Sequence, residues 1–279
     1  MRAERLTDAI AHHAEGPCWW PGWGGLRWVD MLAGDVLALD ASGRIDRVPV
    51  GDVAAMVRPR AAGGAVIAVE RGVALADEDW RVDPLRPMWT TDAVRMNEGG
   101  VAPDGSLYVG SMAYDQTTGA AHLYRVRPDG AVETALDSVT VSNGIDFSPD
   151  GTRAYYNDTP TGRITVFDWS AEDGLARGRA FADVDGFPDG LTVDAEGGVW
   201  TAIFGGSRVE RWSPDGTRDA VVEVGARQVT ACTFGGADLA DLYITTSREG
   251  LTEGEDPAAG ALFLARPGVP GKAVTPFAG

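Results

Sequence analysis

The sequence has few of the side chains on which much enzyme chemistry depends. Its 279 residues include one lysine (Lys272), two cysteines (Cys18 and Cys232) and three histidines. A single lysine disfavours Schiff-base and pyridoxal chemistry, because both need an amine nucleophile. Two cysteines so far apart supply neither a zinc cluster nor a disulfide framework, and we expect both to be free thiols. Catalysis centred on histidine has few candidates.

Basic charge and long apolar runs are also scarce. The chain has 24 Lys and Arg residues against 41 Asp and Glu residues, a formal net charge of −17. Without a basic cluster it cannot bind the nucleic-acid backbone by counterion release, so nucleic acid is excluded as a partner. No segment approaches the roughly 20 apolar residues of a membrane helix, and residues 1–15 have no apolar run typical of signal peptides. We therefore expect a cytoplasmic protein with no membrane partner.

The sequence does contain many short β-like runs divided by turns. The segments 106–109, 163–167 and 241–245 are typical of strands. Pro-Asp-Gly turns stand at 103–105, 128–130, 149–151 and 214–216, where proline presets the backbone and glycine accepts a positive φ. No segment has a sustained 3.6-residue apolar period. The sequence therefore predicts an all-β fold with a strand roughly every 10 residues.

These strands are organised in a repeat with a period in the low forties. Asn97 and Asn143 each lie six residues before the proline of a Pro-Asp-Gly turn, and Glu15 and Asp189 begin equivalent segments. Two less regular copies complete a set of six anchor positions, 41 or 46 residues apart: Glu15, Met56, Asn97, Asn143, Asp189 and Thr230. Such a period is typical of propeller blades. We predict a single six-bladed β-propeller domain over residues 1–279, with four-stranded antiparallel blades and the ring closed by a strand from 2–11.

The anchor residues are the best candidates for a functional site. They precede the predicted first strand of each unit, and if that strand is innermost, the six side chains converge on one end of the central channel. Two carboxylates and two carboxamides would then meet, and a hard cation would satisfy them. Oxygen ligands without His or Cys favour Ca²⁺, with Mg²⁺ or Mn²⁺ as alternatives and Zn²⁺ less suited. The competing interpretation is that Asn and Asp before Gly cap turns.

Four segments carrying anchors resemble a known family, the SMP-30/gluconolactonase/regucalcin-like proteins. The matching segments, which occur in the same order as in that family, are 14–19, 95–99, 142–148 and 188–194. The resemblance covers nearly the whole chain. It implies a six-bladed propeller with a divalent cation in its channel and an enzyme that hydrolyses sugar lactones or related small lactones.

The resemblance also implies roles for particular residues. Metal ligands by this likeness are Glu15, Asn143 and Asp189, and substrate-binding residues are Arg95, Asn97 and Asp115. The cation would polarise the lactone carbonyl, and Asp189 would act as both ligand and general base on water. The sequence departs from the family at Glu98, where many members have Asp, and it lacks a lysine of the animal members.

Two other functions remain open on the sequence alone. The chain could be a calcium-binding propeller without catalytic activity, or its metal site could act on another ester, such as an organophosphate, because propellers carry many chemistries. Of the remaining residues, we predict that His12 and His13 lie on the surface. We predict that at least two of Trp19, Trp20 and Trp23 pack in the blades, which leaves one to line the site, and that the loop 112–122 forms a lid.

Overall fold

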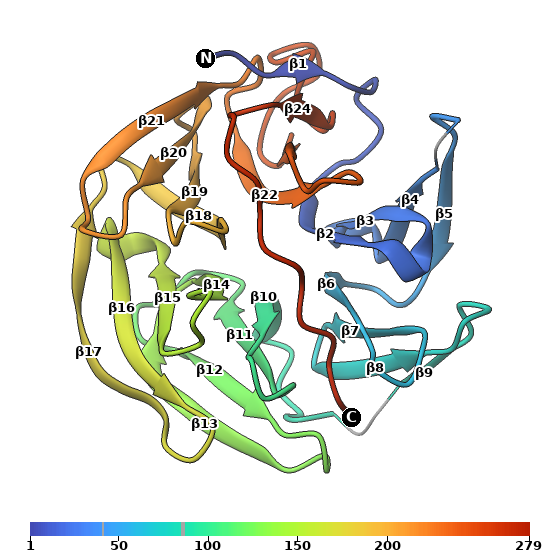
Figure 1. Ribbon diagram of the computed structural model, residues 1–279. Helices are drawn as coiled ribbons and strands as arrows, with labels where there is room; N and C mark the ends of the chain where they lie inside the picture. Colours follow the sequence, from blue (N-terminus) through green and yellow to red (C-terminus); the bar gives the residue numbers. More distant parts are fainter. Residues whose placement is uncertain (41, 85–86) are drawn as a thin grey trace.

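Six antiparallel sheets of four strands each form a ring around a central channel (Figure 1). The structure is a computed structural model that describes residues 1–40, 42–84 and 87–279. The Pro-Asp-Gly turns divide the strands as expected. Gly105 has a φ of 79°, and the carboxylate of Asp104 accepts the Ser106 N–H at 3.0 Å. The predicted all-β, six-bladed propeller is confirmed.

Five of the six blades are meanders of four consecutive strands, so that neighbours in the sequence pair in space. Blade one contains β2 (Ala14–Trp20), β3 (Gly25–Asp30), β4 (Asp35–Leu39) and β5 (Ile45–Pro49). Blade two contains β6 (Ala54–Pro59), β7 (Ala65–Val69), β8 (Gly72–Ala76) and β9 (Val82–Pro84). Blade three contains β10 (Val94–Val101), β11 (Leu107–Ala113), β12 (Ala121–Val126) and β13 (Val132–Val139).

The second half of the ring repeats this arrangement. Blade four contains β14 (Ser142–Phe147), β15 (Arg153–Asp158), β16 (Arg163–Ser170) and β17 (Gly174–Asp183). Blade five contains β18 (Phe187–Val193), β19 (Val199–Phe204), β20 (Arg208–Trp212) and β21 (Arg218–Glu223). Blade six contains β22 (Val229–Gly235), β23 (Asp241–Thr246), β24 (Phe263–Ala265) and β1 (Glu4–Arg5). Three 3₁₀ turns join strands: η1 (Pro21–Trp23), η2 (Met31–Ala33) and η3 (Thr159–Thr161).

The N-terminal segment closes the ring, as predicted. Strand β1 pairs antiparallel with β24, with Glu4 opposite Leu264, and so becomes the outermost strand of blade six. This pairing joins the two ends of the chain in one sheet and removes an open edge. Within the described residues, no helix is long and apolar enough to cross a membrane.

The anchors lie within the innermost strands, which corrects the prediction that they precede them. Glu15 is the second residue of β2 and Asp189 the third residue of β18. In each of these strands the pairing register shifts at or directly after the anchor, between Glu15 and Cys18 and between Pro188 and Leu191. These shifts are β-bulges, which re-aim side chains at the rims of sheets. The innermost strands therefore begin before their anchors, earlier than the sequence repeat indicated.

Glycine follows several anchors because the innermost strands approach one another closely. A Cβ added at Gly144 would lie 2.2 Å from the backbone nitrogen of Leu191, and one added at Gly190 would lie 2.4 Å from Cβ of Ala231. Real Cβ atoms do not come so close to other heavy atoms. Packing between blades therefore requires the glycine in these Asn-Gly and Asp-Gly pairs, which the turn-capping interpretation would also explain.

The C-terminal segment after β24 crosses the end of the channel that lies away from the anchors (Figure 1). The anchors are near the starts of the innermost strands, whereas this tail contacts residues at or after their ends. Gly271 pairs with Asp194, and the backbone N–H of Phe277 donates to Pro59 at 2.8 Å. Lys272, the single lysine, reaches Asp146 of β14 at 2.6 Å. The tail therefore covers one end of the channel and leaves the anchor end to the site.

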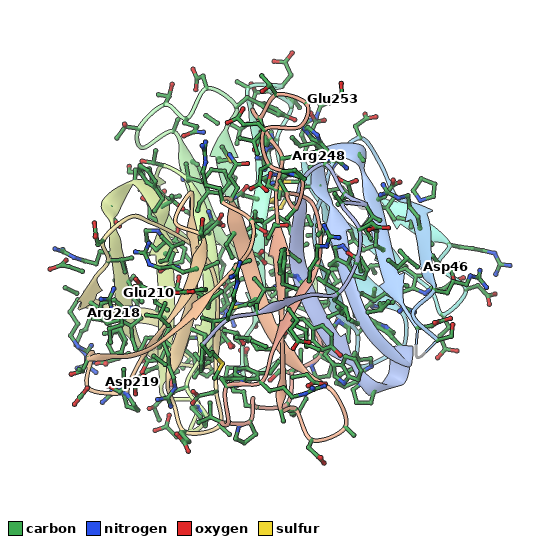
Figure 2. The ribbon with its side chains drawn as sticks, turned by 90° about the horizontal axis from the view of Figure 1, so that it is seen from above. Asp46, Glu210, Arg218, Asp219, Arg248 and Glu253 are labelled. Atoms are coloured by element: carbon green, nitrogen blue, oxygen red, sulfur yellow. The ribbon has the colours of Figure 1, made fainter. Side chains whose placement is uncertain are left out.

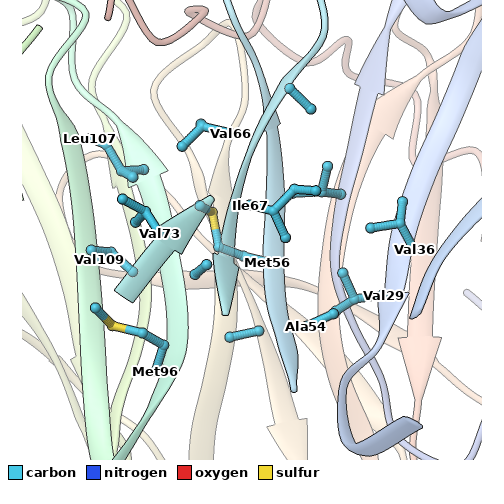
Figure 3. Close-up of a cluster of buried hydrophobic side chains, with 14 of the residues drawn as sticks. Val29, Val36, Ala54, Met56, Val66, Ile67, Val73, Met96, Leu107 and Val109 are labelled. Atoms are coloured by element: carbon cyan, nitrogen blue, oxygen red, sulfur yellow. The ribbon is translucent and has the colours of Figure 1, made fainter. Parts of the chain in front are cut away.

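The largest apolar cluster lies among blades one to three (Figure 3). Met56, an anchor, is fully buried in it, and Met96 beside anchor Asn97 belongs to the same cluster. Phe277 of the tail is also part of it and is 4% exposed. An anchor position can therefore serve packing alone, and the apolar tail residue connects the tail to the core.

We expect replacement of Phe277 by alanine to lower the free energy of unfolding by about 3–5 kcal/mol, because it leaves a cavity in a close-packed cluster. Urea unfolding measures this loss. Val132→Ala is the control, since Val132 is 47% exposed and should cost at most about 0.5 kcal/mol. A Phe277→Ala protein as stable as this control would contradict the packing of the tail.

Candidate functional site

A cavity of about 540 Å³ lies at the anchor end of the channel. It is lined by five of the six side chains predicted to form the site: Glu15, Arg95, Asn97, Asn143 and Asp189. All five are buried, at 3–5% exposure. Glu249 also lines the cavity and follows Arg248, which Figure 2 labels with Glu253 at one end of the ring. The repeat therefore brings together residues from blades one, three, four and five.

The sixth predicted residue, Asp115, is not brought to the cavity with the others. Its carboxylate is exposed and accepts the Thr117 N–H at 2.9 Å. The residues on either side of it, Tyr114 and Gln116, do line the cavity. Because Asp115 caps its own loop, its carboxylate points along the loop. Whether the loop acts as a lid stays a prediction.

Two buried carboxylates, Glu15 and Asp189, line the site. Burial raises the pKa of Glu15 well above its ordinary value, and the nearby charges of Asp189 and Glu98 raise it further. Burial likewise raises the pKa of Asp189, with Glu98 as the next cause. Glu98 is held by Arg58 at 2.8 Å. This concentration of carboxylates is costly without a positive charge and favours binding of a cation.

Asn143 is oriented so that its amide oxygen faces the site. Its amide nitrogen donates to the hydroxyl of Thr159 at 2.8 Å, and that hydroxyl donates to the carbonyl of Pro188 at 2.8 Å. This chain fixes which end of the amide faces inward. The side-chain oxygen of Asn143 is buried without a hydrogen-bond partner, and so is Oδ1 of Asp189.

These unpartnered oxygens fit the predicted cation. A buried oxygen without a donor is unfavourable, and a divalent cation would satisfy both at once. The predicted ligand set contains only two carboxylates, Glu15 and Asp189, and one amide. Accordingly, in the described parts of the chain no group of three or more His, Cys, Asp or Glu side chains is placed to hold a metal by itself. The donor set suits a hard cation that takes its remaining ligands from water or substrate.

Arg95 and Asn97 form one hydrogen-bonded unit. The guanidinium of Arg95 donates to the side-chain oxygen of Asn97 at 2.7 Å, and the amide of Asn97 donates to the carbonyl of Ser142 at 3.0 Å. The guanidinium also lies 5.9 Å from the centre of the Tyr114 ring. Burial lowers the pKa of Arg95, and the carboxylate of Glu249 opposes this shift. Asn97 thus holds a buried positive charge beside the acidic groups.

His13 is buried at the site, so the prediction that it lies on the surface is wrong, whereas His12 is exposed as predicted. Nδ1 of His13 lies 2.7 Å from the hydroxyl of Ser247, and Nε2 lies 4.0 Å from Oε1 of Glu15. Burial and the charge of Arg95 lower the pKa of His13 to about 3, so the ring is uncharged near neutral pH. Ring closure brings His13 beside Ser247, although 234 residues separate them.

Other sequence predictions concern residues near the channel. Trp19 stacks on Tyr243 and Trp23 packs on Trp80, and none of the three tryptophans lines the described cavity. Cys18 and Cys232 are free and buried. They line a separate cavity of about 60 Å³ deeper in the channel, and burial raises the pKa of the Cys18 thiol to about 11. Burial thus disfavours the reactive thiolate form of both cysteines.

Sequence reasoning missed three residues that shape the site: Thr159, Tyr114 and Glu249. Thr159 follows the second strand of its blade, where a turn residue carries no signal of its own. Glu249 follows Arg248 in the loop after β23, and the repeat gives no role to the residues of such loops. Of these three residues, only Tyr114 could have been found from the sequence, because it lies two residues after Met112 in the predicted lid.

Fold and site together define a class of protein: a six-bladed β-propeller with an acidic, cation-compatible site at one end of its channel. Residues 13–248 match the family model of the SMP-30/gluconolactonase/LRE-like region. The chain belongs to this family.

Known members of this family are similar over most or all of the chain. It is 33% identical to the putative sugar lactone lactonase YvrE of Bacillus subtilis, over 100% of this chain and 99% of that protein. It is 34% identical to the 6-deoxy-6-sulfogluconolactonase of Pseudomonas putida, over 91% of each chain. The crystal structure of regucalcin from Agrobacterium tumefaciens, described as a calcium-binding protein, superposes with a TM-score of 0.93. The two proteins are 29% identical in sequence. The superposition covers 99% of this chain and 97% of the Agrobacterium chain.

Proposed function

We propose that this protein is a divalent-cation-dependent lactonase, which hydrolyses the ester bond of a small lactone ring. The observation that carries the proposal is the pair of unpartnered buried oxygens on Asn143 and Asp189, beside Glu15 at the floor of an open cavity. The names of two relatives, a putative sugar lactone lactonase and a sulfogluconolactonase, support the same reaction class.

Glu15, Asn143 and Asp189 would hold the cation. Their donor set of oxygens alone favours Ca²⁺, with Mg²⁺, Mn²⁺ or Zn²⁺ as alternatives. When bound there, the cation supplies Lewis acidity that polarises the lactone carbonyl. Thr159 keeps the oxygen of Asn143 facing inward through its hydrogen bond to the amide nitrogen.

The protein's own side chains would perform the remaining steps. A carboxylate oxygen of Asp189 takes a proton from the attacking water, which makes it the general base. Arg95 donates hydrogen bonds to substrate oxygens, and Asn97 orients the guanidinium through a 2.7 Å hydrogen bond. A contact between substrate and Asp115 would require the loop to turn inward, because this carboxylate caps Thr117.

The proposal is tested by metal removal and reconstitution on a lactone panel. The purified protein is treated with chelator, dialysed, and supplied separately with Ca²⁺, Mg²⁺, Mn²⁺ or Zn²⁺. Acid release from pentono-, hexono- and alkyl-substituted lactones is then followed in a pH-stat, with heat-denatured protein as the control for spontaneous opening. We expect chelation to reduce the rate by at least about 100-fold and a divalent cation to restore it. Unchanged activity after chelation would contradict the dependence on a cation.

A calcium-binding role without catalysis is the second candidate, favoured by the calcium-binding description of the similar Agrobacterium structure. Both candidates predict that calcium stabilises the fold, by about 2.7 kcal/mol at a free concentration 100 times the dissociation constant. They differ in turnover. Calcium-dependent stabilisation together with no opening of any lactone in the panel would favour the second candidate.

A further inference from the structure

The upper wall of the cavity is apolar, in contrast to its charged floor. Six of the cavity-lining side chains form what we call the apolar collar: Leu32, Met112, Val141, Pro160, Phe187 and Phe204. The collar contains two pairs of adjacent residues. Phe187 and Phe204 lie opposite each other where β18 pairs with β19, and Met112 forms a bridge with Val141. The collar comes from loops and strand ends beside the floor residues, and only β18 carries both a collar residue, Phe187, and a floor residue, Asp189.

Part of the apolar surface of the collar is exposed to solvent. Phe187 is 58% exposed, and Tyr114, which also lines the cavity, is 46% exposed. Only three other large hydrophobic residues in the described ranges are as exposed as 40% or more. Exposed aromatic side chains gathered at one concave site indicate a ligand with apolar surface.

The two hydroxyl groups that line the cavity, those of Tyr114 and Thr159, are already engaged within the protein. The hydroxyl of Tyr114 donates to Glu70 at 2.8 Å. The hydroxyl of Thr159 accepts from Asn143 and donates to Pro188. A substituent rich in hydroxyl groups would lose water against this wall and find few new partners, which is unfavourable. An alkyl or aryl substituent would bury surface against Phe187 and Phe204 and would favour binding.

We propose that the preferred substrates are lactones that carry an apolar alkyl or aryl substituent, with the ester group on the floor and the substituent against the collar. This inference rests on the proposed lactonase function and specifies its substrate class. Fully hydroxylated sugar lactones, which the names of the relatives suggest, are then poorer substrates. Phe187 is the residue that determines this preference, because it is an aromatic side chain of the collar that is 58% exposed.

A matched series of lactones tests the inference on the calcium-loaded protein. The series contains unsubstituted δ-valerolactone, δ-lactones with alkyl chains of increasing length, a phenyl-substituted δ-lactone, and glucono-1,5-lactone. We expect kcat/KM to rise at least about tenfold from the unsubstituted to the alkyl- and phenyl-substituted lactones, as is typical of an apolar pocket. Glucono-1,5-lactone is expected to be slower than either substituted compound.

The variant Phe187→Ala provides the second measurement. It should reduce kcat/KM about tenfold for the substituted lactones and by a smaller factor for the unsubstituted lactone, so that the preference between them narrows. Val132→Ala, which removes an exposed apolar side chain away from the cavity, is the matched control and should change neither. Equal loss for both kinds of lactone, or fastest turnover of glucono-1,5-lactone, would overturn the inference alone. If no lactone is opened at all, the proposed function is overturned and this inference with it.

Discussion

Replacing Asp189 by asparagine is expected to reduce lactone opening by about 10³-fold, because it removes both a proton acceptor and one of the two carboxylates offered to the cation. The same change should leave the metal-free protein at least as stable as wild type. Asp189 is 5% exposed, and one of its oxygens has no hydrogen-bond partner. Asparagine has nearly the same shape but no charge to desolvate.

The physical reason for these opposite effects is the raised pKa of Asp189. Burial and the neighbouring Glu98 disfavour its ionised form in the metal-free protein. On the proposed function, the site gains cation binding at the expense of stability, a common trade-off in active sites. Calcium should raise the melting temperature of wild type, and this increase should be lost in Asp189→Asn.

Three measurements on the same preparations check this prediction: acid release from lactones, unfolding in urea without metal, and melting temperature with and without calcium. Asp238→Asn is the control, since Asp238 is exposed between β22 and β23. It should match wild type in all three. Full activity in Asp189→Asn would refute its role as base. A loss of several kcal/mol in metal-free stability would show that its carboxylate is structural.

Replacing Gly144 by alanine is expected to destabilise the fold by about 3 kcal/mol, the upper end of the usual effect of overpacking. The added Cβ would lie 2.2 Å from the backbone nitrogen of Leu191 and 2.8 Å from the carbonyl carbon of Gly190. Both contacts are with backbone, so no side-chain rotation relieves them. Strands β14 and β18 must separate, and they carry Asn143 and Asp189.

Gly144→Ala should therefore also weaken calcium binding, although it changes no ligand. Urea unfolding measures the first effect and calorimetric titration with calcium the second. Gly51→Ala is the matched control, because the nearest atom to its added Cβ lies at an ordinary 3.7 Å. A Gly144→Ala protein that unfolds and binds calcium as this control does would contradict the close approach of the two strands.

The sequence alone determined the fold class and predicted most of the residues that line the candidate site, for reasons that are local. A Pro-Asp-Gly turn requires only its own residues, as the Asp104 carboxylate and the positive φ of Gly105 illustrate. Repetition of such units at a nearly constant spacing places equivalent residues at equivalent points of each blade. Glu15, Asn143 and Asp189 could therefore be selected as anchors from among 41 acidic residues and five side-chain amides.

The tertiary structure determines the burial and orientation of individual side chains, which the repeat does not predict. The repeat treats Met56 as equivalent to Glu15, yet Met56 lies in the apolar core and Glu15 in the cavity. The orientation of Asn143 depends on Thr159, and the burial of His13 depends on Ser247, which is 234 residues away. These contacts form only when blades pack and the ring closes.

The same distinction applies to the substrate. The charged floor follows from one position in each repeat, so the sequence indicates that a cation binds there. The apolar collar consists of residues from loops and strand ends in blades one, three, four and five, such as Leu32 and Phe187. No spacing relates them, because they converge only through the curvature of the ring. The scarcity of lysine, histidine and cysteine limited the chemistry, and the closed ring determined which surfaces the substrate meets.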